Sequence, residues 1–232
     1  MSQVKLSHLA RPVFVTAVLV NLGFVTLHAA PLNPGTTIPA PNEPGQPSAG
    51  ATLLASSTVN FVAPFSFTGT LTSEVWNNDA SSPFGPASLT FTYQFNIDAS
   101  SGNAVDRFTI SSFSGYLTDA SYSLGSSGSV VPQLLPSVVA PLSVGRAPAG
   151  DIVRWVFEDG FGNATLAPGD SSALLVVQTS ATAWQNTIGG VSDGSTANVS
   201  SFAPAVIPEP GTVFVTGLAG GVLFVLRRSR FV

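Results

Sequence analysis

The sequence contains no cysteine, and its 232 residues include two histidines and eight lysines or arginines. Without cysteine the chain has no disulfide framework, no thiolate nucleophile and no cysteine-ligated metal. Charged residues make up 9% of the chain and hydrophobic residues 44%, which excludes a disordered polyelectrolyte, because disorder requires low hydrophobicity and high charge. The 22 glycines and 18 prolines argue against a bundle of helices, since both residues disfavour helix interiors.

The first 29 residues have the three-part pattern of a secretory signal peptide. Lys5 and Arg11 give a positive n-region, an apolar stretch from 13 to 27 follows, and Ala29 offers signal peptidase a small residue. We therefore expect signal peptidase to cleave after Ala29. An uncleaved N-terminal anchor helix is the alternative.

Cleavage there would remove both histidines and the single lysine. Residues 30–207 would then carry three cations, Arg107, Arg146 and Arg154, against eleven acids, a formal charge of −8. Ser-His-Asp, Cys-His and Ser-Lys catalytic groups are excluded from such a chain. Three arginines also cannot build the basic face that the phosphate backbone requires. We expect no enzyme, no cofactor and no nucleic-acid partner, and glycosidase chemistry would need Glu74 and Glu158 to meet across one cleft.

The C-terminus combines three features in a fixed order. Pro208, Glu209 and Pro210 precede an apolar run from 211 to 226, and Arg227 and Arg228 follow it. Sixteen residues of helix span about 24 Å at about 1.5 Å per residue, slightly less than a bilayer core of about 30 Å. The arginines should remain cytoplasmic by the positive-inside rule. We expect a transmembrane helix over 211–226 with the body outside and the tail inside.

Together, the Pro-Glu-Pro triplet, the short glycine-containing helix and the terminal arginines resemble the PEP-CTERM sorting segment of exported bacterial proteins. The resemblance covers residues 208–232. It implies an exosortase as partner, a membrane enzyme thought to cut near the triplet, and a Gram-negative host that makes extracellular polysaccharide. It also implies a localisation that begins at the inner membrane and ends at the cell surface or in the extracellular matrix. An ordinary C-terminal tail anchor is the alternative.

Residues 51–207 form the ectodomain, and their hydrophobic period is two. Leu89–Ile97 alternates apolar and polar residues over nine positions, which predicts a half-buried strand. Val59–Phe67 is another expected strand, and the continuous apolar run from Leu174 to Val177 predicts a strand covered on both faces. Glycine, proline and aspartate clusters separate such segments. We predict an all-β fold, an antiparallel β-sandwich of jelly-roll-like type.

Six prolines lie within residues 30–50. We expect this stretch to form no packed element and to act as a semi-extended linker or as an ordered strand lead-in on the surface.

Loop carboxylates are the remaining candidates for a metal site. Asp151, Glu158 and Asp159 sit in or beside expected loops and could ligate calcium, although no EF-hand spacing occurs. Turn formation explains the same residues more simply, because aspartate before glycine bonds its own backbone. We expect Arg154 to pair with Asp151 or Glu158, with binding of an acidic sugar as its alternative.

The three tryptophans decide between two classes of function. Trp155 is expected in the core, whereas Trp76 and Trp184 could stack on sugar rings if they are exposed. We predict a noncatalytic surface or matrix protein sorted by exosortase. A carbohydrate-binding module for exopolysaccharide or an external glycan is the alternative. An ice-binding protein is a minor one, because threonines at 68, 70, 72, 90 and 92 form too short an array.

Overall fold

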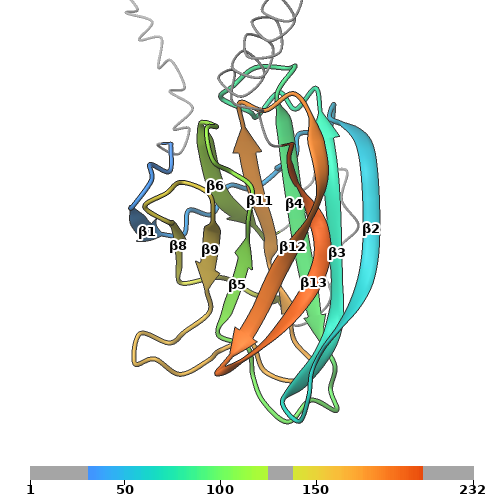
Figure 1. Cartoon of the computed structure of the whole chain (residues 1–232), viewed down its shortest axis with the longest axis vertical. Helices are drawn as coiled ribbons and strands as arrows, with labels where there is room; N and C mark the ends of the chain where they lie inside the picture. Colours follow the sequence, from blue (N-terminus) through green and yellow to red (C-terminus); the bar gives the residue numbers. More distant parts are fainter. Residues whose placement is uncertain (1–30, 125–137, 206–232) are drawn as a thin grey trace, which may run out of the picture.

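The computed structural model describes residues 31–124 and 138–205, and these residues form two β-sheets packed face to face (Figure 1). No helix occurs in the described ranges, so none there is suited to crossing a membrane. The expected signal helix and transmembrane helix lie outside these ranges. The prediction of an all-β, sandwich-like domain is confirmed.

One sheet has six strands, all paired antiparallel. Their order across the sheet is β1 (Thr37–Pro39), β8 (Ser143–Arg146), β9 (Val153–Val156), β5 (Arg107–Ile110), β12 (Trp184–Asp193) and β13 (Ser195–Pro204). Neighbouring strands in this sheet come from distant parts of the chain, except in the β8–β9 pair and the β12–β13 hairpin.

The other sheet has seven strands. Its long part runs β2 (Thr52–Ala63), β3 (Phe67–Asn77), β4 (Leu89–Ile97), β11 (Leu174–Thr179) and β6 (Thr118–Ser123). The short strand β10 (Ser171–Ser172) also pairs with β4, and β7 (Val138–Val139) lies parallel to β10. That parallel pair makes the sheet mixed rather than wholly antiparallel.

Expected and observed strands agree best where the residue pattern is regular. β4 has the predicted bounds, and every residue of β11 is buried, as expected of a strand covered on both faces. The prediction of one strand over Val59–Phe67 is wrong, because the chain turns between β2 and β3. Phe65 sits in that turn with φ of 63°, a conformation that no strand residue adopts.

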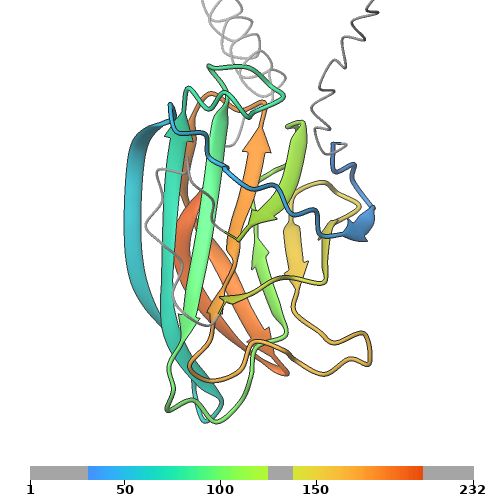
Figure 2. The ribbon, with the colours of Figure 1, turned by 180° about the vertical axis from the view of Figure 1, so that it is seen from behind.

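Residues 31–50, here called the N-terminal strap, are packed against the sandwich. The expectation that they form no packed element is wrong, while the alternative of an ordered lead-in agrees with the structure. β1 pairs with β8, and Leu32 is buried in the core. The strap then crosses the outer face of the seven-stranded sheet (Figure 2), where Ser121 Oγ donates to Gln46 Oε1 at 2.8 Å.

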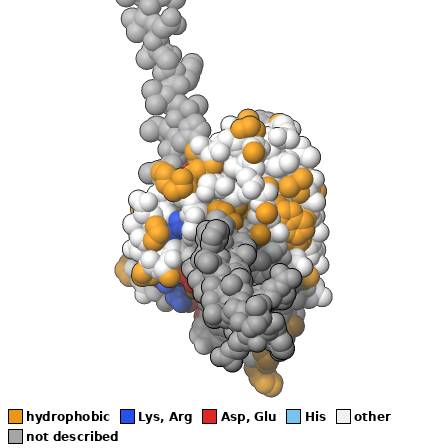
Figure 3. Space-filling view, turned by 45° about the horizontal axis from the view of Figure 1, so that its top comes forward, with side chains coloured by type: hydrophobic (Ala, Val, Ile, Leu, Met, Phe, Trp, Pro, Cys, Tyr) orange, Lys and Arg blue, Asp and Glu red, His pale blue; other side chains and the backbone are white. Residues whose placement is uncertain are grey.

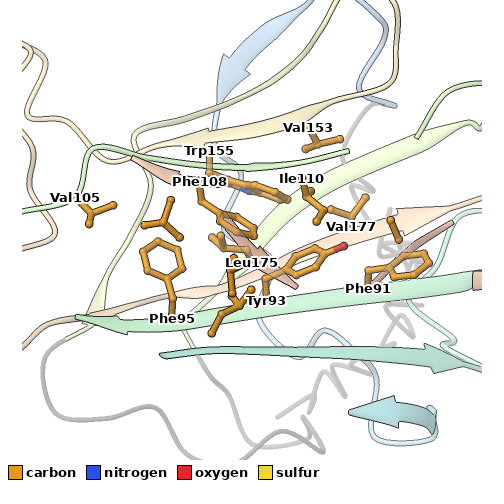
Figure 4. Close-up of a cluster of buried hydrophobic side chains, with 14 of the residues drawn as sticks. Phe91, Tyr93, Phe95, Val105, Phe108, Ile110, Val153, Trp155, Leu175 and Val177 are labelled. Atoms are coloured by element: carbon orange, nitrogen blue, oxygen red, sulfur yellow. The ribbon is translucent and has the colours of Figure 1, made fainter. Parts of the chain in front are cut away.

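Aromatic side chains fill the space between the sheets (Figure 4). Tyr93 of β4 packs against Phe108 of β5 with ring centroids 5.5 Å apart, and Phe108 stacks on Trp155 of β9 at 6.0 Å. The Tyr93 hydroxyl donates to the carbonyl of Phe202 at 2.8 Å, so its polar end is satisfied inside the core. Aromatic contacts of this kind contribute about 0.5–1.5 kcal/mol each beyond area burial. The prediction that Trp155 fills the core is confirmed.

Candidate functional site

The expected sorting residues Pro208, Glu209, Pro210, Arg227 and Arg228 lie outside the described residues. Their role stays a prediction from sequence.

Asp159, one of the three calcium candidates, organises a turn. Its carboxylate accepts hydrogen bonds from Asn163 Nδ2 at 2.7 Å and from the backbone amides of Phe161 and Asn163 at 2.9 and 3.1 Å. The bonds from Asn163 and Phe161 lower the pKa of the Asp159 carboxyl. A carboxylate that accepts three donors from its own loop fits the turn interpretation.

The other two candidates make separate contacts. Glu158 Oε1 lies 3.9 Å from Arg107 Nη2, while the charge of Asp151 acts on Arg146, where it opposes the lowering of the arginine's pKa by burial. Within residues 31–124 and 138–205, no three acidic or histidine side chains are grouped to hold a metal ion. Arg154, expected to pair with Asp151 or Glu158, has neither within 4 Å, because Glu158 faces Arg107 instead.

A carboxylate pair of the glycosidase type does not form from Glu74 and Glu158. Glu74 lies on the outer face of the seven-stranded sheet, where Ser56 and Thr92 donate to it at 3.4 Å. Glu158 follows β9 in the six-stranded sheet, so the aromatic core separates the two carboxylates.

The tryptophans do not form an exposed row in the described part of the chain. Trp155 is fully buried, and Trp76 is 4% exposed and donates to Thr92 Oγ1 at 3.2 Å. Trp184 is 38% exposed, but its ring packs edge-on against Phe202 at 5.1 Å. Thr92 is itself buried, as is Thr90, so neither belongs to a surface threonine array.

A buried polar cluster on the outer face of the seven-stranded sheet was not predicted. The Asp79 carboxylate accepts hydrogen bonds from Ser81, Thr90 and Gln178 side chains and from the backbone amides of Ser48 and Ser81. Every contact comes from a neighbouring loop, strand or strap residue of the same domain. The cluster therefore fastens the N-terminal strap to the sheet and has no free group for a ligand.

The three arginines of the described chain meet at one place. A groove of about 450 Å³ on the six-stranded sheet is lined by Gly35, Thr37, Arg107, Thr109, Gly145, Arg146, Ala147, Pro148, Ile152 and Arg154. We call it the arginine groove. None of the eleven acids of residues 31–205 is among its lining residues. A strongly acidic domain thus gathers its cations around one hollow.

Strand register explains how the groove forms. Phe108 and Trp155 face the core, so their neighbours Arg107 and Arg154 point to the opposite, outer face. Arg154 of β9 lies opposite Thr109 of β5, two residues along from Arg107, which makes the two arginines diagonal neighbours. Their guanidinium groups are therefore presented on the same surface.

A glycine forms the adjoining part of the groove. Gly145 of β8 lies beside Arg154 and, on its other side, beside Thr37 of β1. A Cβ atom at Gly145 would lie 2.6 Å from Thr37 Oγ1, so a larger residue would collide with the groove wall. The hollow next to Arg154 depends on this missing side chain.

Arg146 has a different role from its two neighbours. Its guanidinium donates to the carbonyls of Gly150, Leu32, Phe113 and Tyr116 at 2.9, 3.2, 2.8 and 2.8 Å. The guanidinium donors of Arg146 bind the backbone of its own domain, so Arg146 contributes its positive charge to the groove but no donor for a ligand.

Arg107 and Arg154 are more open to a ligand. Two carboxylates, of Asp106 and Glu158, approach Arg107 at 3.9 Å, and the Arg107 side chain is 37% exposed. Arg154 is exposed. On the face shown in Figure 3, the basic groups in view lie at one edge, with acidic groups beside them. Planar guanidinium groups with free donors are suited to binding carboxylates or other oxyanions.

No family model, no curated protein and no solved structure matches this chain.

Proposed function

We propose that this protein is an exported, noncatalytic surface or matrix protein that an exosortase sorts through residues 208–232. One observation carries the proposal: a Pro-Glu-Pro triplet, an apolar run and terminal arginines follow one another behind a signal-like N-terminus. The described domain supports the proposal indirectly, since an all-β body with a compact aromatic core suits a protein that works outside the cell.

The order of the C-terminal parts suggests how sorting proceeds. The apolar run 211–226 stops transfer in the inner membrane, and Arg227 and Arg228 hold its end in the cytoplasm. Pro208 and Pro210 have fixed φ angles near −65° and donate no backbone hydrogen bond, which keeps the triplet extended. An extended peptide just outside the bilayer is the form that a protease groove accepts. Cleavage there would release the ectodomain for transfer to the surface or matrix.

The noncatalytic part of the proposal follows from composition. After cleavage at Ala29 the ectodomain has no histidine, lysine or cysteine to serve as nucleophile or base. Its arginines and carboxylates are instead suited to structure and binding. A jelly-roll-like relationship for the sandwich remains part of the proposal.

Replacing Pro208, Glu209 and Pro210 by alanine tests the sorting mechanism. Alanine would let the helix continue through the cleavage site, so we expect the variant to keep its C-terminus and remain in the inner membrane. Alanine at 212–214 is the matched control, because it changes three adjacent residues but keeps an apolar helix. Mass spectrometry of the surface fraction measures the outcome in a host with an exosortase. A wild-type surface protein that still ends at Val232 would make the tail a simple anchor.

A second candidate function is the binding of a carbohydrate. The arginine groove favours it, because the exposed Arg154, the half-buried Arg107 and two threonine hydroxyls converge on one hollow of about 450 Å³. Small-molecule sites commonly have volumes of about 300–1,000 Å³. An ice-binding role receives less support, since Thr90 and Thr92 are buried.

A further inference from the structure

We propose that the arginine groove binds a carboxylate-bearing polysaccharide, with Arg154 and Arg107 as the residues that contact the carboxylates. The inference rests on the second candidate function above and gives it a site and a ligand class.

Charge distribution is the first argument. The described residues carry eleven acids and three arginines, and all three arginines line this groove while none of the acids does. The carboxylates of Asp106 and Glu158 lie beside Arg107 and that of Asp151 acts on Arg146, so Arg154 is the groove cation whose charge no carboxylate within 4 Å offsets. Its charge attracts anions that the remainder of the domain repels.

Hydrogen bonding is the second argument. Arg146 shows how this fold uses an arginine for structure, with four bonds to backbone carbonyls. Arg154 has no acidic partner within 4 Å in the described chain, whereas Arg107 has the carboxylates of Asp106 and Glu158 at 3.9 Å. The exposed Arg154 therefore retains its donors for a ligand, and Arg107 lies beside it as a second, partly paired cation.

The composition of the groove selects the kind of anion. Thr37 and Thr109 bring hydroxyls to the same surface, and Gly145 between Thr37 and Arg154 adds no side chain to it. Pro148 and Ile152 add apolar surface, on which the apolar face of a sugar ring can rest. A uronic acid unit offers a planar carboxylate for the arginine fork, hydroxyls for hydrogen bonds and an apolar ring face.

Chains with a phosphate at each unit fit less well. Nucleic acid binding needs an extended row of cations along the phosphate backbone, and the described domain offers three arginines at one hollow. A free phosphate ion would need only the guanidinium groups and would leave the hydroxyl and apolar lining unused. The groove therefore favours a carboxylated sugar chain, and the phosphate ion is an outcome that the experiment must separate.

The test uses the full chain, purified in a mild detergent and titrated by calorimetry. The probes are an oligogalacturonate, a neutral glucan oligomer of equal length, and inorganic phosphate. Arg154→Gln removes one groove cation from an exposed position and should fold normally. The matched control is Asn60→Asp, which changes net charge by the same amount at an exposed position of β2, in the other sheet. Arg154→Lys keeps the charge but loses the fork.

We expect oligogalacturonate to bind the wild type and Asn60→Asp alike, about tenfold more weakly to Arg154→Lys, and at least about a hundredfold more weakly to Arg154→Gln. Binding should weaken as salt is raised, because the site is exposed.

Four results would overturn the inference. Equal affinity of Arg154→Gln and wild type would place the site elsewhere, and equal affinity for the neutral glucan would remove the role of the carboxylate. Both of these leave carbohydrate binding itself intact. Binding of phosphate as tight as that of oligogalacturonate would make the groove a simple anion site. Failure of every sugar probe, with the sorting result unchanged, would reject carbohydrate binding and leave the sorting proposal standing.

Discussion

Replacing Arg146 by methionine should destabilise this domain more than any other single change to its charged residues. Methionine has a similar length but no donor, so the carbonyls of Leu32, Phe113, Tyr116 and Gly150 would lose their partner in a buried position. Hydrogen bonds to a charged group are worth about 1.5–3 kcal/mol each, which gives a gross loss of about 6–12 kcal/mol.

Part of that loss is offset, because the variant no longer buries a charge. Burial lowers the pKa of Arg146, a sign that the surroundings disfavour its charged form, although the nearby Asp151 carboxylate opposes the effect. Desolvating an ion costs several kcal/mol, and removing one partner of a buried ionic arrangement has a net cost of about 3–5 kcal/mol. That is a large share of the about 5–15 kcal/mol by which domains are stable.

Denaturant titration of the full chain, followed by tryptophan fluorescence, measures the change. We expect Arg146→Met to lower the free energy of unfolding by about 3–5 kcal/mol and the melting temperature by about 10 °C. The same substitution at exposed Arg154 is the control and should cost less than about 0.5 kcal/mol. Arg146→Lys should fall between them, since one ammonium cannot reach four carbonyls. If Arg146→Met and Arg154→Met unfold within about 1 kcal/mol of each other, the four bonds contribute little and the reasoning fails.

Three further changes test other parts of the fold by denaturation. Asp79→Asn should cost about 2–3 kcal/mol at neutral pH, because the amide mispairs with donors that the buried carboxylate accepts. Burial alone raises the pKa of Asp79, but hydrogen bonds from Ser81, Ser48 and Thr90 lower it below 3.8. The stability advantage of the wild type should therefore persist above pH 3.8 and be lost as the pH falls through the lowered pKa. Glu74→Gln should stabilise slightly above pH 4.5, because burial raises the pKa of Glu74 and disfavours its charge, and a pH-independent difference would contradict this. Gly69→Ala should cost about 1–3 kcal/mol or more, since its Cβ would lie 2.1 Å from the Asn96 carbonyl oxygen, and unchanged stability would refute the close approach.

The alternation of apolar and polar residues predicted the long, regular strands of the fold. Alternation in Leu89–Ile97 gave β4 its bounds, and four consecutive apolar residues indicated the doubly covered strand β11. The turn at Phe65 escapes the pattern because a phenylalanine with positive φ is rare, and Ala63, Phe65 and Phe67 keep the alternation of a strand, although Pro64 is a turn signal. β1, β7 and β10 are too short, at two or three residues, to show any period.

The arginine groove could not be read from the sequence. Its lining comes from β1, β8, β9 and β5 and the loops between them, and nothing in the sequence tells which of these strands are neighbours. Arg154 offered one usable signal, a cation in a strand with apolar neighbours on both sides. The sequence suggested that Arg154 pairs with Asp151 or Glu158. In the folded domain Glu158 instead lies 3.9 Å from Arg107.

The strand order of the six-stranded sheet also sets how late in synthesis the domain can fold. β5 lies between β9 and β12, and β12 depends in turn on β13 at the end of the described chain. Pairings between segments so distant in sequence form slowly, because loop closure must precede the contacts. We expect the chain to stay unfolded until β13 has left the ribosome. Under the proposed export, this delay would give a machinery that requires unfolded substrates time to engage the chain. The groove on the six-stranded sheet would appear only in the completed domain.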